Sequence, residues 1–119
     1  MTIAEQNRHA FEQMGKRVKQ LLDMHGWTKK QLSEKSGVSV HIITEIIRKP
    51  DYNGLIINVF RVTNALGLEI DEIFIEDEEW EKLVKTLPYR FELLEKFSHL
   101  TEDQKEEVLE FAKKLCKDV

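Results

Sequence analysis

The sequence predicts an all-α protein, and three observations favour this fold class. Apolar residues recur with the helical period of 3.6 along most of the chain. No segment alternates apolar and polar residues for long enough to form a sheet, and only two prolines and five glycines interrupt the pattern. A chain of 119 residues is long enough for one small domain followed by an accessory helical segment.

The first periodic segment ends at Gly26, a residue type favoured just after the last helical turn. Its apolar residues share one helical face: Phe11, Met14, Val18, Leu21 and Leu22. A capping box follows, because Thr28 and Gln31 are spaced so that each side chain can bind the other residue's free backbone N–H. This box predicts a second, short helix that contains Leu32 and ends near Gly37.

Ser39 is a favourable N-cap for a third helix, which must end before Pro50. Ile43 and Ile46 lie on the same face of that helix because they are three residues apart. Residues 51–54 (Asp-Tyr-Asn-Gly) have the composition of a turn, so we expect them to connect the third helix to the next one.

A fourth helix is predicted to end at Gly67, and Asp71 can cap a short fifth helix that contains Ile73 and Phe74. The expected core face of the fourth helix consists of Ile56, Val59, Phe60, Thr63 and Leu66. Five short helices can enclose one hydrophobic core, and we place this domain at residues 8–75.

The acidic residues 76–79 mark the boundary to a second segment, residues 76–119. Helical spacing begins at Trp80, and Pro88 is expected to end or kink this helix before the spacing resumes. Thr101 and Gln104 form another capping box, which opens the last predicted helix.

Charge is distributed unevenly along the chain, whose net charge is −4. Residues 8–50 carry nine Lys and Arg against four Asp and Glu, whereas residues 76–119 carry eight against thirteen. Since local charge decides attraction to phosphate, the basic N-terminal half is compatible with nucleic-acid binding.

The second and third helices have the spacing of a helix-turn-helix, with Gly37 permitting the positive φ of a tight turn. Inward packing that would fix the angle between the helices is expected from Leu32, Val38, Ile43 and Ile46. The outer face of the third helix then carries Val40, His41, Thr44, Glu45 and Arg48. A helix with such a face fits the major groove of DNA, where base edges can be distinguished.

Residues 14–75 resemble the Xre family of lambda repressor/Cro-like helix-turn-helix proteins. The resemblance rests on Gly15-x-Arg17-Val18-x-x-Leu21, Leu32-(x)4-Gly37-Val38-Ser39, Ile43-x-x-Ile46-x-Arg48, and Ala65-Leu66-Gly67 before Asp71-Glu72-Ile73. It implies a five-helix DNA-binding domain whose third helix enters the major groove. The implied DNA-facing residues are Lys29, Ser39, Val40, His41, Thr44, Glu45 and Arg48, with Lys29 close to a phosphate.

The chain departs from the family pattern at Val40, Ile42 and Ile47, where family members usually carry polar residues. Val40 can contact a thymine methyl group, and Glu45 can accept a hydrogen bond from a cytosine amino group while repelling phosphate. Arg48 fits a phosphate or a neighbouring carboxylate as well as a guanine. For His41 and Lys29, plain exposed positions on a solvated helix are the alternatives.

The C-terminal segment holds more apolar surface than two short helices can bury between them. We expect self-association through Trp80, Leu83, Val84, Leu87, Phe91, Leu94, Phe97, Leu100, Val108, Phe111 and Leu115. The alternative is that these residues pack back onto the DNA-binding domain. Residues 77–84 also resemble the start of the multimerisation region of SinR-type repressors, which implies tetramerisation and control by a small antirepressor protein.

These patterns together predict a repressor that binds double-stranded DNA at a palindromic operator as a dimer or tetramer. The alternative is a protein-interaction module, such as an antitoxin or antirepressor, with weak or no DNA binding. We expect neither catalysis nor a cofactor or metal, because the sequence shows no nucleophile–base pair, phosphate-binding loop or ligand spacing, and Cys116 stands alone. The first residues lack the apolar core of a signal peptide, so we expect a cytoplasmic protein.

Overall fold

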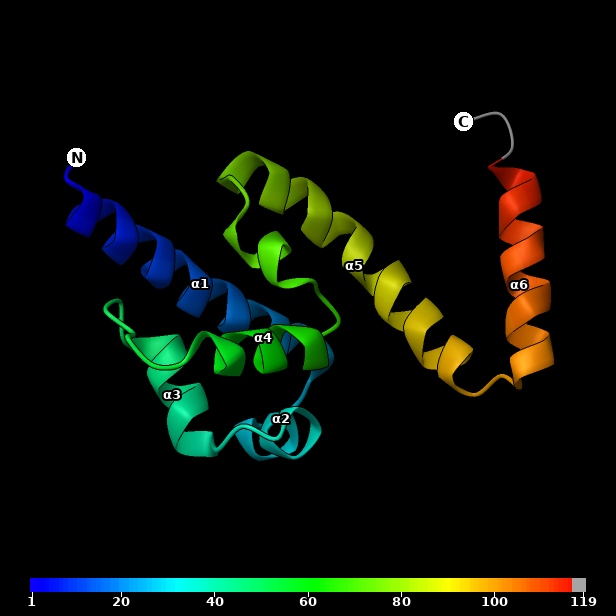
Figure 1. Cartoon of the computed structure of the whole chain (residues 1–119), viewed down its shortest axis with the longest axis horizontal. Coiled ribbons are helices and arrows are strands. Elements are labelled where there is room, and N and C mark those ends of the chain that lie inside the picture. Colours follow the sequence, from blue (N-terminus) through cyan, green and yellow to red (C-terminus); the bar gives the residue numbers. More distant parts are fainter. Residues whose placement is uncertain (117–119) are drawn as a thin grey trace. The chain divides into compact units, whose positions relative to one another are not determined.

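The computed structural model describes residues 1–116, and helices are its only regular elements within that range. Along the chain they are α1 (Ile3–His25), α2 (Lys29–Ser36), α3 (Val40–Arg48), α4 (Ile56–Ala65), the 3-10 helix η1 (Ile70–Phe74), α5 (Asp77–Ser98) and α6 (Glu102–Leu115) (Figure 1). The predicted all-α class is confirmed. None of these helices combines the length and the apolar character needed to cross a membrane.

The chain forms two compact units, which meet between Lys82 and Leu83. This division lies seven residues beyond the boundary expected at residues 75 and 76, because the first turns of α5 belong to the N-terminal unit. The N-terminal unit also begins earlier than residue 8, since α1 extends back to Ile3 and is capped by the side chain of Thr2.

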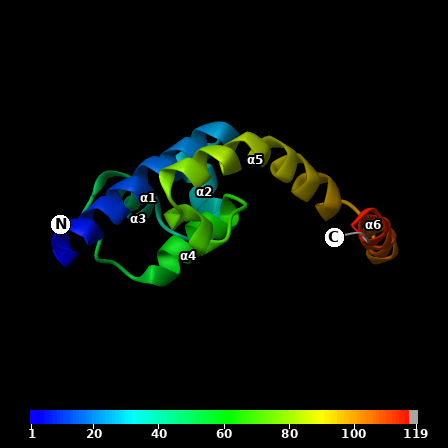
Figure 2. The same cartoon turned by 90° about the horizontal axis from the view of Figure 1, so that it is seen from above.

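The core of the N-terminal unit lies between α1, α2, α3, α4 and η1 (Figures 1 and 2). Ten apolar side chains there have no exposed surface: Met14, Val18, Leu21, Leu32, Ile43, Ile46, Val59, Val62, Leu66 and Ile73. The core faces predicted for the first three helices are therefore confirmed except at Phe11, which is partly exposed. Burial of a full aliphatic side chain contributes roughly 1.5–3 kcal/mol, so this cluster is the main stabilising feature of the unit.

The core face predicted for α4 is partly wrong. Ile56 and Phe60 are 61% and 43% exposed, whereas Val62, which was not expected in the core, is fully buried. The buried stripe follows i, i+3 and i+4 spacing from Val59, and Phe60 is rotated about 100° away from it because it is the next residue along the helix.

The expected cap of η1 is also wrong, and of the two outcomes expected at Pro88, an end or a kink, the structure excludes the end. Glu69, and not Asp71, forms the N-cap of η1, where its backbone N–H donates to the Glu72 carboxylate at 2.9 Å. Pro88 lies inside α5, which continues to Ser98. Proline removes a single backbone N–H and disfavours the interior of a helix, but it does not prevent helix formation on both sides.

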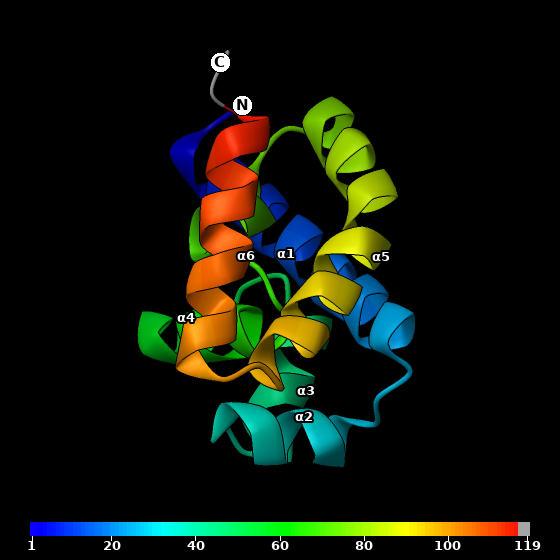
Figure 3. The ribbon, with the colours of Figure 1, turned by 90° about the vertical axis from the view of Figure 1, so that its right-hand side faces the viewer.

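The C-terminal unit consists of α5 from Leu83 onward and α6, joined by a short turn (Figure 3). The predicted capping box is confirmed, because the Thr101 backbone N–H donates to Gln104 Oε1 at 2.9 Å and the Gln104 N–H donates to Thr101 Oγ1 at 3.2 Å. Lys105 Nζ lies 5.6 Å from the centroid of the Phe97 ring and so links the two helices. No side chain of α6 is buried.

Candidate nucleic-acid interface

The turn between α2 and α3 has the geometry that the sequence predicts. Thr28 and Gln31 form the capping box at the start of α2. Gly37 ends this helix with φ of 75°, a left-handed conformation that glycine adopts without the strain of a Cβ atom. Ser39 Oγ then accepts a hydrogen bond from the Ile42 N–H at 3.2 Å and caps α3.

Buried apolar side chains line the inner side of this motif. Leu32, Ile43 and Ile46 are fully buried, and Val38 is 2% exposed. Because α2 contributes one of these residues and α3 two, the angle between the helices is fixed by the core of the unit.

A close approach between α1 and α3 also positions the third helix. A Cβ atom on Gly15 would lie 2.5 Å from the Ile47 carbonyl oxygen and 2.8 Å from that of Ile46. Glycine is therefore required where α1 passes the last turn of α3. The sequence pattern included Gly15 but gave no indication of this contact, since the two segments are more than 30 residues apart.

The outer face of α3 is open to solvent along its length. Ser39, His41 and Arg48 are exposed, Val40 is 41% exposed, and Thr44 and Glu45 are partly exposed. The apolar core of the unit does not cover this face, so these side chains lie where a ligand approaching α3 would meet them.

Lys29 and Thr44 are brought into contact across the two helices. Lys29 Nζ donates a hydrogen bond to Thr44 Oγ1 at 3.2 Å. Lys29 is therefore placed on the same surface as α3, and its charge lies beside the centre of the exposed face. The bond leaves the Thr44 hydroxyl hydrogen available as a donor.

Glu45 is flanked by two basic groups on its own helix. Its Oε1 atom lies 3.1 Å from His41 Nε2 and 3.3 Å from Lys49 Nζ. The three residues are four apart and therefore share one face. Lys49 offsets the negative charge of Glu45, which reduces the phosphate repulsion expected for this residue. Lys49 was not among the predicted site residues, although its i, i+4 spacing from Glu45 was a usable signal.

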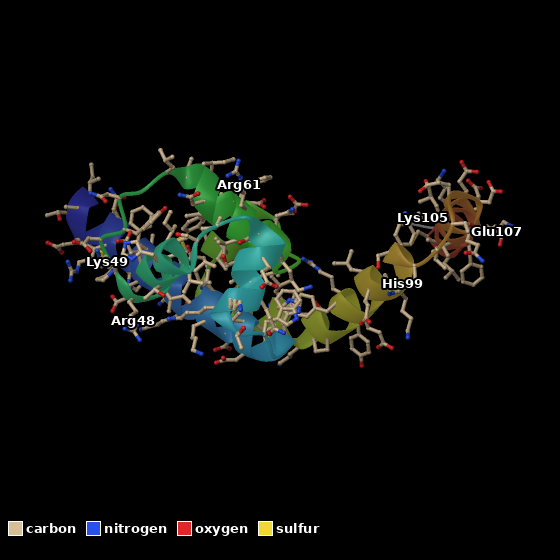
Figure 4. The ribbon with its side chains drawn as sticks, turned by 90° about the horizontal axis from the view of Figure 1, so that it is seen from below. Arg48, Lys49, Arg61, His99, Lys105 and Glu107 are labelled. Atoms are coloured by element: carbon tan, nitrogen blue, oxygen red, sulfur yellow. The ribbon has the colours of Figure 1, made fainter. Side chains whose placement is uncertain are left out.

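Arg48 and Lys49 lie together at the C-terminal end of α3, at the edge of the molecule (Figure 4). Arg61, on α4, lies on another side of the N-terminal unit in the same view. Cationic side chains thus gather at the end of the candidate recognition helix, and Arg61 provides an exposed arginine away from it.

The residues predicted for self-association fall into three groups by burial. Trp80 is 6% exposed and donates through Nε1 to Gln20 Oε1 at 3.0 Å, so it packs back onto the N-terminal unit, as in the alternative interpretation of this segment. Leu87 is likewise fully buried within the chain, whereas Leu83, Val84, Phe91, Phe97 and Leu100 are partly buried. The exposed members are Leu94, Val108, Phe111 and Leu115.

Three further apolar side chains of the C-terminal unit are exposed and were missed: Tyr89, Leu93 and Leu109. Each lies next to or between positions that were predicted: Leu93 precedes Leu94, Leu109 follows Val108, and Tyr89 lies between Leu87 and Phe91. Within residues 1–116, no group of three His, Cys, Asp or Glu side chains is arranged to hold a metal ion.

Comparisons with known proteins give one match among solved structures. No protein-family model matches the chain, and no curated protein matches it. The chain is similar to one from a solved structure titled "SinR protein/SinI protein complex", with 27% sequence identity and a TM-score of 0.49. The match covers 87% of this chain and 98% of the other chain.

Proposed function

We propose that the protein is a sequence-specific transcriptional repressor that inserts α3 into the major groove of a palindromic operator as a dimer or higher oligomer. The observation that supports this proposal most strongly is the uncovered outer face of α3, held at a fixed angle to α2 by the buried side chains around Gly37. The proposal is a binding function without a catalytic step.

Each exposed side chain of α3 has a defined role in this proposal. Arg48 contacts a phosphate or a guanine edge, and His41 and Thr44 face the bases. Val40 offers a methyl surface to thymine, because it is exposed at the start of the helix. Lys29 binds a phosphate beside Thr44, to which it is already bonded.

Dimerisation is assigned to the C-terminal unit. A single small module makes few contacts with DNA, and a dimer reads two half-sites about one helical turn, roughly 34 Å, apart. The exposed apolar side chains on both helices of this unit are Tyr89, Leu93, Leu94, Val108, Leu109, Phe111 and Leu115. We assign this surface to a second copy of the same hairpin, because a two-fold interface uses the same patch on both subunits.

Substitution of Thr44 and Arg48 by Ala tests the DNA-binding role. Full-length protein is first used to enrich duplexes from a random pool, and the enriched duplex is then titrated by fluorescence anisotropy. We expect Arg48→Ala to weaken binding by at least about tenfold, which corresponds to about 1.4 kcal/mol. Arg61→Ala is the matched control, since it removes the same charge from another side of the unit. Equal effects of the two arginine substitutions would contradict the proposal.

Leu94→Asp tests self-association independently of DNA. We expect the wild-type chain to sediment as a dimer or larger species and Leu94→Asp to shift it toward the monomer. Leu55→Asp is the control, because Leu55 is an exposed leucine at the N-cap of α4 in the other unit, where Asp is tolerated. A wild-type chain that sediments only as a monomer would contradict the dimer.

The second candidate is a protein-interaction module on the same fold. The exposed Val40 and the partly exposed Ile42 and Ile47 on α3 favour it, since apolar surface suits a protein partner. In that case the wild-type chain enriches no duplex even at low salt, and Thr44→Ala with Arg48→Ala removes a co-purifying protein partner instead.

A further inference from the structure

We propose that Glu45 is a specificity-determining residue, whose carboxylate selects a cytosine in each half-site and is positioned for this role by His41 and Lys49. The inference rests on the proposed function and deepens it, because it names the base that one residue of α3 reads. An acidic side chain on a DNA-facing helix repels phosphate, so its presence there needs a compensating interaction.

Glu45 lies on the side of α3 that points away from the core. Ile43 is fully buried and marks the inner side of the helix. Because successive residues are rotated by about 100°, Glu45 and His41 each lie about 160° around the helix from Ile43, one on either side of the outward direction. A base edge that meets the outer face of α3 therefore lies within reach of both side chains.

The two oxygens of the Glu45 carboxylate have different surroundings. Oε1 lies 3.1 Å from His41 Nε2 and 3.3 Å from Lys49 Nζ. Within residues 1–116, no hydrogen bond or ion pair involves Oε2, and no buried side-chain oxygen lacks a partner, so Oε2 is in contact with solvent. The side chain as a whole is only 29% exposed. One oxygen is thus held by the protein while the other is presented to a ligand.

The same contacts reduce the repulsion between Glu45 and the DNA backbone. Lys49 carries a positive charge, and His41 donates through a ring N–H or, when it is protonated, adds a second positive charge. Arg48 and Lys49 lie together at this end of α3 (Figure 4). The carboxylate is therefore surrounded by cationic and donor groups, which lets it approach a duplex.

The chemistry of a carboxylate limits the bases that it can bind in the major groove. It accepts hydrogen bonds and donates none. Guanine presents only acceptors there, and thymine presents an acceptor and a methyl group, so neither offers a donor. Adenine places the acceptor N7 beside its amino group, whereas cytosine presents the N4 amino donor alone. Cytosine is therefore the base that Oε2 selects.

The first test measures base preference with full-length wild-type protein and Glu45→Gln. Each position of the enriched half-site is replaced by the other three base pairs, and competition with the labelled duplex gives relative affinities. We expect the wild-type chain to prefer cytosine by at least about tenfold at one position, where Glu45→Gln prefers adenine, because glutamine pairs with adenine N6 and N7. Preferences at the other positions should change by less than about threefold.

Glu34→Gln is the matched control, because it makes the same chemical change at an exposed position of α2. Glu34 lies about 140° around that helix from Lys29, which contacts α3. This variant should keep the wild-type preference for cytosine. An unchanged preference in Glu45→Gln, or a change in its affinity that is equal for all four bases, would overturn the inference. A wild-type chain that enriches no duplex would instead contradict the proposed function.

The second test concerns the positioning role of Lys49. Lys49→Met removes the ammonium group that contacts Oε1 and keeps an unbranched side chain. We expect the preference for cytosine to fall from at least about tenfold to below about threefold, because the carboxylate is less well oriented. Lys30→Met removes the same charge from an exposed position of α2 and should leave the preference unchanged. An unchanged preference in Lys49→Met would overturn the positioning role, whatever the change in overall affinity.

Discussion

Substitution of Gly15 by Ala is expected to destabilise the fold, although the same change in most helix interiors is stabilising. In an unobstructed helix, Gly→Ala stabilises by about 1 kcal/mol. Here the new Cβ atom would lie 2.5 Å from the Ile47 carbonyl oxygen, while ordinary contacts begin at 3.4 Å. The last turn of α3 must therefore retreat by about 0.9 Å, the difference between these two distances.

The obstacle is backbone, which cannot rotate away as a side chain can. Overpacking of this kind destabilises by about 1–3 kcal/mol, and a gap of 0.5–1 Å also weakens the surrounding dispersion contacts. With an overpacking effect at the upper end and the helix-propensity gain subtracted, we expect Gly15→Ala to be less stable than the wild-type chain by about 2 kcal/mol.

Urea denaturation followed by circular dichroism measures the difference in free energy of unfolding. Affinity for the enriched duplex shows whether α3 has moved. Gly15→Ala should also weaken DNA binding, because α3 is displaced. Gly26→Ala is the control: its φ of 70° makes alanine strained, but nothing lies within 4 Å of the added atom. It should lower stability by about 1–2 kcal/mol and leave DNA affinity unchanged. A Gly15→Ala protein at least as stable as the wild type would refute the reasoning.

Three further predictions concern the helix-turn-helix. Gly37→Ala should lower the free energy of unfolding in urea by about 1–2 kcal/mol through its positive φ, and an unchanged midpoint would contradict the turn geometry. Ser39→Ala should lower it by about 1 kcal/mol because the Ile42 N–H loses its acceptor, whereas Ser39→Asp should restore it. The affinity for the enriched duplex should fall steeply between about 50 and 200 mM salt, and Arg48→Ala should reduce the slope of log affinity against log salt by about 0.9 if Arg48 binds a phosphate.

Local rules predicted the part of the fold that local contacts determine. Thr28, Ser39 and Thr101 cap helices through hydrogen bonds to residues three positions away, so a short stretch of sequence contains all the participants. Gly37 is equally local, since its role depends on its own φ. The arrangement of α2, α3 and the outer face of α3 followed from these residues together with helical periodicity.

The errors arose where the deciding contact is distant in the sequence. Trp80 has the spacing of an exposed apolar helix face, but its hydrogen-bond partner Gln20 lies 60 residues away. The burial of Arg17, which is 4% exposed, and the close approach at Gly15 have the same origin. Phe60 shows a different limit: periodicity identifies an apolar stripe on α4, but its exact centre depends on how α2 and η1 pack against it.

The hydrogen bond between Lys29 and Thr44 has a consequence for altering the target of this protein. Thr44 accepts a hydrogen bond from Lys29, which lies outside its own helix. A graft of residues 40–48 onto a related scaffold would therefore transfer the DNA-facing residues without the side chain that positions Thr44. The smallest segment to transplant runs from Thr28 to Lys49, because it contains Lys29, the turn at Gly37 and the whole of α3.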